Sequence, residues 1–149
     1  MLGVDLSQEL RHDYEVFGAD VVRRSSFVVR GFYKLDITKK QNVLAVIRNL
    51  NPDIIIHAAA WTDVDGCELD PKKAYKINSE GTKNVASACK AIDAILVYLS
   101  TDFVFDGRKK NPYKETDRTN PLSAYAGSKL KGEAAIKRIL KKYFILRTS

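Results

Sequence analysis

The sequence lacks several features that define common classes of protein. No apolar run approaches the ~18 residues that a membrane-spanning helix needs. The first residues do not show the charged-then-apolar order of a signal peptide. The two cysteines, Cys67 and Cys89, form no C-x-x-C pair and have no obvious histidine partners, which argues against a disulfide or a metal site. These absences favour a cytoplasmic chain with reduced, partly buried thiols and no bound metal.

Internal repeats, low-complexity segments and linkers are also missing from the sequence. The 149 residues correspond to one domain, residues 1–149, which is long enough to bury a sizeable core. Hydrophobic residues make up 45% and charged residues 29% of the chain, as in an ordinary globular protein.

Positive charge prevails over negative charge, since the net charge is +7 and the isoelectric point about 9.4. A basic balance suits either nucleic acid or a phosphorylated ligand. The lysines are scattered, and the one cluster, in residues 137–142, is placed to close a helix, where cations favour the negative end of the dipole. No zinc module, RNA-binding aromatic pair or basic tail is present. We therefore expect a solvated basic surface and no nucleic-acid partner.

The spacing of apolar residues predicts helices that alternate with strands. Leucines at every fourth position open the chain in a helix. Further helices are expected to follow residues 36–38, to begin at the Asp70–Pro71 pair, and to cover residues 122–142. Strands are expected at residues 14–18, within 27–35, at 54–57 and 95–99 as buried strands, and from 143 to 146.

This alternation indicates an α/β fold with a parallel sheet and helices on both faces. Ligands of such sheets bind beyond the carboxyl ends of the strands. Residues 58–62 and 100–103 both follow predicted buried strands, so both are expected to face that crevice. The helix over 122–142 adds a third element to the same place.

Tyr125 and Lys129 are the most informative pair in this helix, because residues four apart lie on one face. A phenol with a pKa near ~10 is a poor acid at neutral pH until a nearby cation favours its phenolate form. Lys129 is placed to be that cation, and Thr101 to hold a carbonyl oxygen against Tyr125. The three residues therefore suit proton transfer at a carbonyl or alcohol oxygen.

Seven segments carry a resemblance to a known family: PDIIIHAAAWTDVD (52–65), INSEGTKN (77–84), STDFVFDG (100–107), YKETD (113–117), NPLSAY (120–125), KLKGE (129–133) and LRTS (146–149). Their order and spacing resemble the extended short-chain dehydrogenase/reductases, and most closely the dTDP-4-dehydrorhamnose reductase branch. The resemblance covers most of residues 33–149. It implies a Rossmann-like, doubly wound parallel sheet.

The family's reaction implies roles for residues 101–103, after the predicted strand at 95–99, and for Tyr125 and Lys129 in the helix over 122–142. Members reduce the 4-keto group of a nucleotide-linked deoxysugar with NADPH or NADH, on the way to dTDP-rhamnose and surface polysaccharide. Tyr125 would protonate the new alkoxide, and Lys129 would hold the nicotinamide ribose and lower the tyrosine pKa. Thr101 would bind the ketone oxygen, with Asp102 and Phe103 beside it in the substrate segment.

The resemblance also implies which residues meet the cofactor. Asp36 and Ile37 match positions that clasp the adenine. The backbone under the middle of the cofactor matches three consecutive alanines, which are Ala58, Ala59 and Ala60. Thr62 lies beside the cofactor. From the residues alone, Asp36 equally fits a helix N-cap, and the alanines equally fit close helix–strand packing.

The choice between the two nicotinamide cofactors depends on the residues after the second family strand. Asp20 there favours a free ribose 2′-hydroxyl, whereas Arg23 and Arg24 favour a 2′-phosphate. The two adjacent arginines, next to Ser25, tip the expectation towards NADPH.

The start of the chain departs from the family pattern, because a first strand and a full glycine-rich turn are missing. We expect the chain to start inside the phosphate loop, with Gly3 as the last glycine of that loop. The first strand and the C-terminal substrate domain would then be lacking, and neighbouring strands would have unpaired edges. The expected consequence is little turnover by the chain alone, and a homodimer only in the full-length form.

Alternatives remain open at the level of the sequence. A nucleotide-sugar 4-epimerase or dehydratase uses the same fold, and a non-catalytic binding or regulatory protein is a third hypothesis. Trp61 fits either a contact with a sugar or base, or a hydrophobic plug. Asn78 is expected to be a helix-surface amide rather than part of a proton relay, and His57 to be structural.

Overall fold

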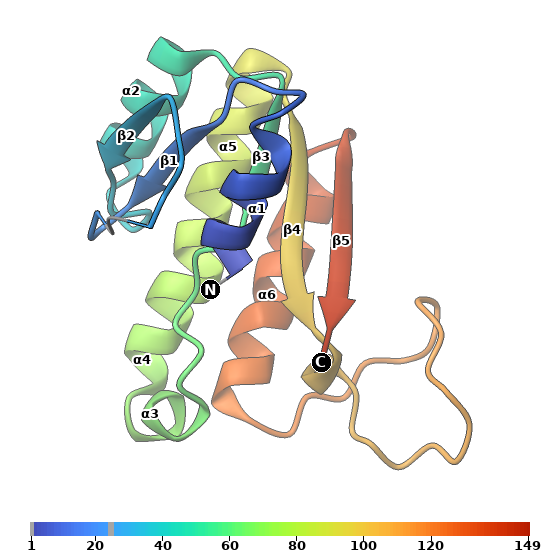
Figure 1. Ribbon diagram of the computed structural model, residues 1–149. Coiled ribbons are helices and arrows are strands. Elements are labelled where there is room, and N and C mark those ends of the chain that lie inside the picture. The colour runs from blue at the N-terminus through green and yellow to red at the C-terminus, as the bar shows by residue number, and fades with distance from the viewer. Residues whose placement is uncertain (1, 24–25) are drawn as a thin grey trace.

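Helices alternate with parallel strands in the computed structural model, which describes residues 2–23 and 26–149 (Figure 1). The strands are β1 (Phe17–Asp20), β2 (Gly31–Lys34), β3 (Ile54–His57), β4 (Ile95–Thr101) and β5 (Tyr143–Thr148). The helices are α1 (Leu2–Leu10), α2 (Lys40–Leu50), α3 (Val64–Leu69), α4 (Pro71–Ala74), α5 (Thr82–Ile92) and α6 (Ala124–Ile139), with a π-helix η1 (Tyr75–Gly81) and a 3-10 turn η2 (Asp102–Val104). This alternation confirms the predicted α/β class.

The strands form two parallel sheets rather than one. β1 pairs with β2, and β4 lies between β3 and β5. Figure 1 shows β1 between β2 and β3, so a break in the sheet separates β1 from β3. Among the described residues the facing edges of these two strands have no strand partner, in line with the edges expected from the sequence.

Helices cover the two faces of the sheets unequally. α5 packs against both α2 and α6, and these three lie behind the strands in Figure 1, whereas α1 lies in front. The main core forms between the three helices and the sheet. Its largest fully buried members come from three elements, and they are Val43 of α2, Leu96 and Tyr98 of β4, and Ile136 of α6.

β3 corrects one expectation from the sequence, since its unbroken apolar run predicted a buried strand. His57 is buried, but Ile54 and Ile56 are 47% and 36% exposed. The reason is that β3 lies at the edge of its sheet and α5 covers only one of its faces. Its apolar run therefore meets the core on alternate residues only.

Two element boundaries also differ from expectation. The first strand begins at Phe17 rather than at residue 14, because the Tyr14 N–H donates to the Leu10 carbonyl and prolongs the turn that ends α1. The last helix begins at Ala124 and ends at Ile139, so Leu122 lies outside it and is exposed. The pattern of apolar residues continues past both ends of α6 and does not mark its limits.

The helical segment after β3 contains a π-helix that its spacing did not reveal. Asp70 caps α4 as predicted, with its side chain accepting a hydrogen bond from the Lys73 N–H, and Pro71 follows at the first turn. η1 then adds a wider turn before α5 continues. Such wide turns are rare and occur often at functional sites.

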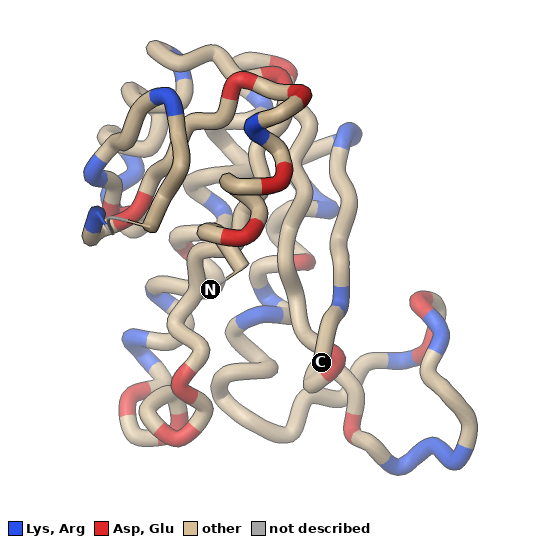
Figure 2. The backbone as a smooth tube through the Cα atoms, in the orientation of Figure 1, with Lys and Arg blue, Asp and Glu red and all other residues tan. Residues whose placement is uncertain are grey.

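No helix among residues 2–23 and 26–149 is long and apolar enough to span a bilayer. The positions of Lys and Arg and those of Asp and Glu are spread over the described backbone (Figure 2). This distribution fits the scattered basic surface expected from the sequence.

Candidate active site

The start of α6 fixes the position of Tyr125. Ser123 caps this helix, its side-chain oxygen accepting a 3.1 Å hydrogen bond from the Ala126 N–H. Tyr125 and Lys129 follow one turn apart, and both are buried. The two side chains share one helix face, as their spacing predicted, and this face is turned towards the interior.

The carboxyl end of β4 brings three predicted site residues to Tyr125. The Thr101 hydroxyl oxygen accepts a 3.2 Å hydrogen bond from the Phe103 N–H and so opens the turn η2. The Phe103 ring meets the Tyr125 ring edge-on, with 6.4 Å between centroids. Thr101 and Asp102 both influence the Tyr125 phenol electrostatically. The structure thus gathers Thr101, Asp102 and Phe103 around Tyr125.

The Tyr125 phenol is shielded from water, which decides its acidity. Burial is the largest effect and raises its pKa, and the nearby Cys67 and Asp102 add to this; a hydrogen bond with Thr101 opposes it. Its ring packs with Cys67 and Ala74 in a small core of its own. The phenol is therefore protonated at neutral pH, in the form that can donate a proton.

Lys129 makes a contact that the sequence did not indicate. Its Nζ donates a 2.5 Å hydrogen bond to the Leu99 carbonyl and lies 4.3 Å from the centroid of the Tyr98 ring. Burial lowers its pKa to about 8, while Glu133 acts in the opposite direction. In this conformation the ammonium group does not lower the pKa of Tyr125, which is raised rather than depressed. The amino group instead contacts the Leu99 carbonyl of β4.

Asn78 is buried, which corrects its assignment to the helix surface. Its side-chain oxygen accepts from the Trp61 N–H at 2.8 Å, and its amide donates to the Trp61 carbonyl and to the Ser128 hydroxyl, both at 3.0 Å. η1 supplies this side chain, so the π-helix joins α6 to the segment after β3. Both N–H donors of the amide are therefore engaged, one by Trp61 and one by Ser128.

The three alanines after β3 differ in exposure along the segment. Ala58 and Ala59 are exposed, so close helix–strand packing does not explain their small side chains. Ala60 is half-buried, and it directly precedes Trp61, whose backbone the Asn78 side chain holds. Packing therefore accounts at most for Ala60, and the backbone at the first two alanines is accessible to a ligand.

Trp61 anchors the end of this segment. It is half-buried, packs with the small core around Cys67, and lies under the Lys73 ammonium group, 4.0 Å from the ring centroid. Of the two roles that the sequence left open, the structure thus favours the hydrophobic plug.

Asp36 forms a turn of its own rather than a helix cap. Its Oδ1 accepts from the Thr38 N–H at 2.9 Å and from the Thr38 hydroxyl at 2.7 Å, and these bonds lower its pKa. The residue before α2 is Lys39, whose side chain makes no cap. Ile37 packs closely against Gly81, and its carbonyl accepts from Asn84. An ionised carboxylate thus stands beyond the end of β2.

The predicted residues near the start of the chain are less firmly tied to the site. Gly3 lies in α1, where an added Cβ would be in ordinary contact with the Phe27 ring. Arg23 is exposed, and its guanidinium lies 5.8 Å from the centroid of the Phe32 ring. Arg24 lies outside the described residues, and so does Ser25. Thr62 is exposed next to Trp61.

His57 has a structural role, as expected. The Thr82 hydroxyl donates to the Asn78 carbonyl at 2.7 Å, so its oxygen accepts from His57 Nε2, 3.0 Å away. Burial first, and then the charge of Lys129, lower the His57 pKa to about 3. The imidazole is neutral and takes part in a buried chain of hydrogen bonds.

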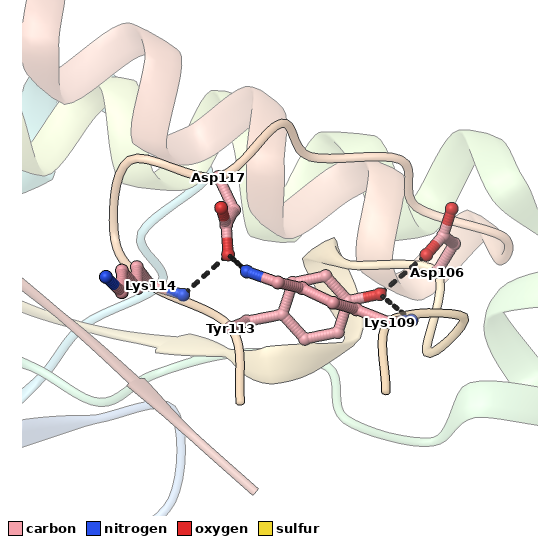
Figure 3. Close-up of polar contacts among 5 residues, drawn as sticks. All are labelled: Asp106, Lys109, Tyr113, Lys114 and Asp117. Carbon is pink, nitrogen blue, oxygen red and sulfur yellow. Dashed lines mark hydrogen bonds and ion pairs between the residues drawn. The ribbon is translucent and has the colours of Figure 1, made fainter. Parts of the chain in front are cut away.

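Residues 105–121 form a protruding loop that is built around two aspartates (Figure 3). Asp106 accepts from the Tyr113 hydroxyl at 2.7 Å, and Asp117 accepts from the Lys114 N–H at 2.8 Å. Asp117 also pairs with the Lys109 ammonium group at 2.5 Å. Hydrogen bonds, that from Tyr113 first, lower the Asp106 pKa to about 2. The loop is thus ordered by its own side chains beside Phe103.

Two shallow hollows of the surface lie elsewhere in the described chain. One is lined by Arg11 with residues 14–16 and 28–30, and the other by residues 51–53, 92–95 and 142. Neither includes Tyr125, Lys129 or Thr101. The candidate site is therefore defined by its side-chain contacts and includes neither hollow.

Comparison with known proteins decides the family of the chain. The profile described as RmlD substrate binding domain matches residues 1–149, the whole sequence. The chain belongs to this family. The dTDP-4-dehydrorhamnose reductase of Aggregatibacter actinomycetemcomitans is 43% identical over 118 residues, which are 79% of this chain and 40% of that protein. The enzyme of the same name from Escherichia coli K12 is 40% identical over 114 residues, 76% of this chain and 38% of that protein.

Solved structures agree with this membership of the RmlD family. A hypothetical dTDP-4-dehydrorhamnose reductase from Sulfolobus tokodaii superposes with a TM-score of 0.87 at 44% identity, over 99% of this chain and 52% of that one. The reductase of Bacillus anthracis in complex with NADP superposes with a TM-score of 0.80 at 37% identity, over 91% of this chain and 54% of that one. The Thermus thermophilus UDP-glucose 4-epimerase, at 24% identity and a TM-score of 0.88 over 99% and 51%, shows the Rossmann-like fold alone. The chain spans about two fifths of the curated relatives and half of these structures.

The sequence pattern predicts Tyr125, Lys129 and Thr101 as site residues, but not the residues that contact them. Cys67, Ser128 and the Leu99 carbonyl carry no pattern that marks them, because they meet the site only through tertiary packing. Glu133 is different, since it follows Lys129 by four residues and so shares its helix face. That spacing was a signal that could have been used.

Proposed function

We propose that the chain supplies the reductive chemistry of an NADPH-dependent reductase acting on the 4-keto group of a dTDP-linked deoxysugar. The observation that carries this proposal is the buried, protonated Tyr125 phenol beside Thr101 at the carboxyl end of β4. A carbonyl oxygen held by both hydroxyls would be polarised, and Tyr125 would give it the proton that completes an alcohol. Family membership and the NADP complex of a relative support the choice of reaction.

The residues beyond the carboxyl ends of β2 and β3 fit a dinucleotide in their chemistry. The exposed Ala58 and Ala59 leave backbone accessible beyond β3, and Ala60 continues that backbone towards Trp61. The ionised Asp36 stands beyond β2. NADPH would supply the hydride for the carbonyl carbon, and the three alanines would lie under its middle.

Charged side chains would hold the two ends of the cofactor. Lys129 would release its bond to Leu99 and hold the nicotinamide ribose, while Asp36 and Ile37 would contact the adenine. A 2′-phosphate would be favoured over a free hydroxyl by two adjacent residues, Arg23 and Arg24. Asp20 would accept the free hydroxyl of NADH instead.

The remaining roles follow from the same proposal. Asp102 and Phe103 would contact the sugar nucleotide beside Thr101, while Thr62 would line the cofactor. Gly3 would stand at the end of the phosphate loop. The product would enter dTDP-rhamnose and polysaccharide synthesis in the cytoplasm. We further propose that the chain corresponds to part of a dinucleotide domain, that its turnover alone is low, and that the full-length form is a homodimer.

The first test is a titration of the whole chain with NADPH and then NADH, followed through Trp61, the sole tryptophan. Saturable quenching with energy transfer to the nicotinamide is expected, and stronger binding of NADPH would support the roles of the arginines. A folded chain without any saturable binding would contradict the cofactor assignment.

The chemical step is tested by Tyr125→Phe, which keeps the ring and removes only the hydroxyl. With dTDP-4-dehydrorhamnose and NADPH, oxidation of the nicotinamide by the unchanged chain, however slow, should fall by a factor of about 100 or more, as for the loss of a general acid. Binding of NADPH should stay within about threefold. Product analysis separates the hypotheses, because an epimerase would return a sugar at unchanged oxidation level. Equal rates for both proteins would overturn the role of Tyr125.

A further inference from the structure

A charged network outside the reacting groups joins three elements of the site. Glu133 of α6 is completely buried. Its Oε1 accepts from the Ser100 hydroxyl at 2.6 Å and from Arg147 Nε at 3.0 Å, and its Oε2 accepts from Arg147 Nη2 at 2.7 Å. We call Ser100, Glu133 and Arg147 the strut. The carboxylate is paired at both oxygens, as a buried charge requires.

The members of the strut stand next to the residues proposed to react. Ser100 directly precedes Thr101 in β4, and Arg147 pairs with Ser100 in the register between β4 and β5. Glu133 lies one helical turn after Lys129, which itself lies one turn after Tyr125. The strut therefore links the helix with the proposed acid to the strand end with the proposed oxygen-binding hydroxyl.

The strut also reaches the protruding loop. The Arg147 guanidinium lies 5.0 Å from the centroid of the Phe105 ring. Phe105 stacks on Tyr113 at 4.3 Å with an angle of 12° between the rings, and the Tyr113 hydroxyl donates to Asp106. A continuous set of contacts thus runs from Glu133 to the network of Figure 3.

We propose that Glu133 is a positioning residue, which through Ser100 and Arg147 fixes α6 against the ends of β4 and β5 and so sets Tyr125 against Thr101. The inference rests on the proposed function, because it assigns a purpose to the same site. Only the bidentate, fully paired arrangement satisfies both Glu133 oxygens, so a shift of α6 along β4 would leave a buried charge without partners. A plain contribution to stability is the weaker explanation, since buried ion pairs often stabilise no more than apolar residues of the same size.

The electrostatics of Lys129 agree with this placement. The charge of Glu133 raises the pKa of Lys129, although burial lowers this pKa by more. The positive charge of Lys129 in turn lowers the pKa of His57. The carboxylate therefore helps to keep a buried ammonium group charged beside the site.

The decisive experiment compares Glu133→Gln with two matched controls in the whole chain. Asp93→Asn makes the same carboxylate-to-amide change in the exposed ion pair with Lys142. Ile136→Val weakens a buried contact of the same helix without touching the strut. Two local readouts are taken well below the unfolding temperature: the rate of acylation of Lys129, identified by mass spectrometry, and hydrogen exchange of residues 100–106.

In Glu133→Gln the amide nitrogen faces a guanidinium N–H, and both groups are donors. One of the two hydrogen bonds from Arg147 is therefore lost. Acylation of Lys129 should become at least fivefold faster and exchange at residues 100–106 at least tenfold faster, with both controls within twofold of the unchanged chain. Equal readouts in Glu133→Gln and Ile136→Val would overturn the proposal and leave the strut a support of global stability. If Glu133→Gln does not fold, Ser100→Ala cuts the β4 contact alone, and unchanged exchange in that variant overturns the proposal.

Failure of the proposed function is recognised separately. Absence of NADPH binding by the unchanged chain would contradict that function, but it would not alter the labelling and exchange comparison. Conversely, NADPH binding by the unchanged chain, with no local change in Glu133→Gln, would support the proposed function and contradict the positioning role of Glu133.

Discussion

At the scale of the single residue, burial rather than spacing sets the state of the ionisable groups. Tyr125 and Lys129 have the spacing of a cooperating pair, yet the phenol pKa is raised and the amino group donates to Leu99. His57 is held neutral by the same desolvation. In each case burial removes water from around the charged form of the group and so disfavours it, and no sequence pattern indicates how large this desolvation effect is.

The pH dependence of folding should reveal His57. Its pKa is about 3 in the folded chain and 6.5 when unperturbed. The unfolded chain therefore binds more protons between these values, and the stability present above pH 6.5 is lost as the pH falls. The expected slope is up to about 1.4 kcal/mol per pH unit, measured as the free energy of unfolding in urea between pH 7 and 4.5.

The chain holds only one other histidine, which provides the control. His57→Gln should flatten the slope in this window, whereas His12→Gln, at an exposed site, should leave it unchanged. A steep slope that persists in His57→Gln would assign the effect to the carboxylates instead.

At the scale of the element, the crossing of α6 over η1 determines the layout of the site. Gly132 faces this crossing, and a Cβ there would lie 2.8 Å from the Asn78 carbonyl oxygen and 2.9 Å from the Tyr98 hydroxyl. The close approach lets Asn78 reach both Ser128 and Trp61. A small residue at this position thus allows the π-helix to connect α6 with the segment after β3.

Gly132→Ala is therefore expected to destabilise the fold although alanine favours helices. The added methyl group meets backbone that cannot move away, and overpacking of this kind costs about 1 to 3 kcal/mol. Denaturant unfolding measures the loss. The same change at Gly3 in α1 meets only ordinary contacts and should be neutral or slightly stabilising. A neutral Gly132→Ala would show that the helices separate without cost.

At the scale of the whole molecule, the described chain exposes more surface than a compact monomer. Its accessible area is 9582 Å² for 16.7 kDa, whereas the usual scaling gives about 7,600 Å² for this mass. Much apolar surface lies on one face of the sheet, where Phe144 and Leu146 are 61% and 47% exposed. The split sheet and the protruding loop add to the excess (Figure 1).

The alternation in β5 gives a prediction at this scale. Phe144→Lys should change the free energy of unfolding by no more than about 0.5 kcal/mol, because the side chain is already in water. It should also reduce binding of an apolar dye and self-association, measured by fluorescence and sedimentation. The neighbouring Ile145 packs against the core, so Ile145→Lys should cost several times as much. Similar losses for both variants would contradict the exposed face.

The sequence by itself determined the alternation of helices with parallel strands, although not every boundary of these elements. Periodic apolar runs predict elements because local geometry repeats along the chain, and the same helical geometry places Tyr125 and Lys129 on one face of α6. Asp70 shows the same for a helix start, since a cap needs only its own backbone.

Only the tertiary structure decided how these elements meet and what each buried group contacts. The exposed face of β3, the π-helix, the buried clamp of Asn78 and the strut through Glu133 all depend on which elements cover one another. Burial and hydrogen-bond pairing arise from contacts between residues far apart in the chain. They set the pKa values and fix the side chains, so the chemistry of the site is read from the fold and not from the spacing alone.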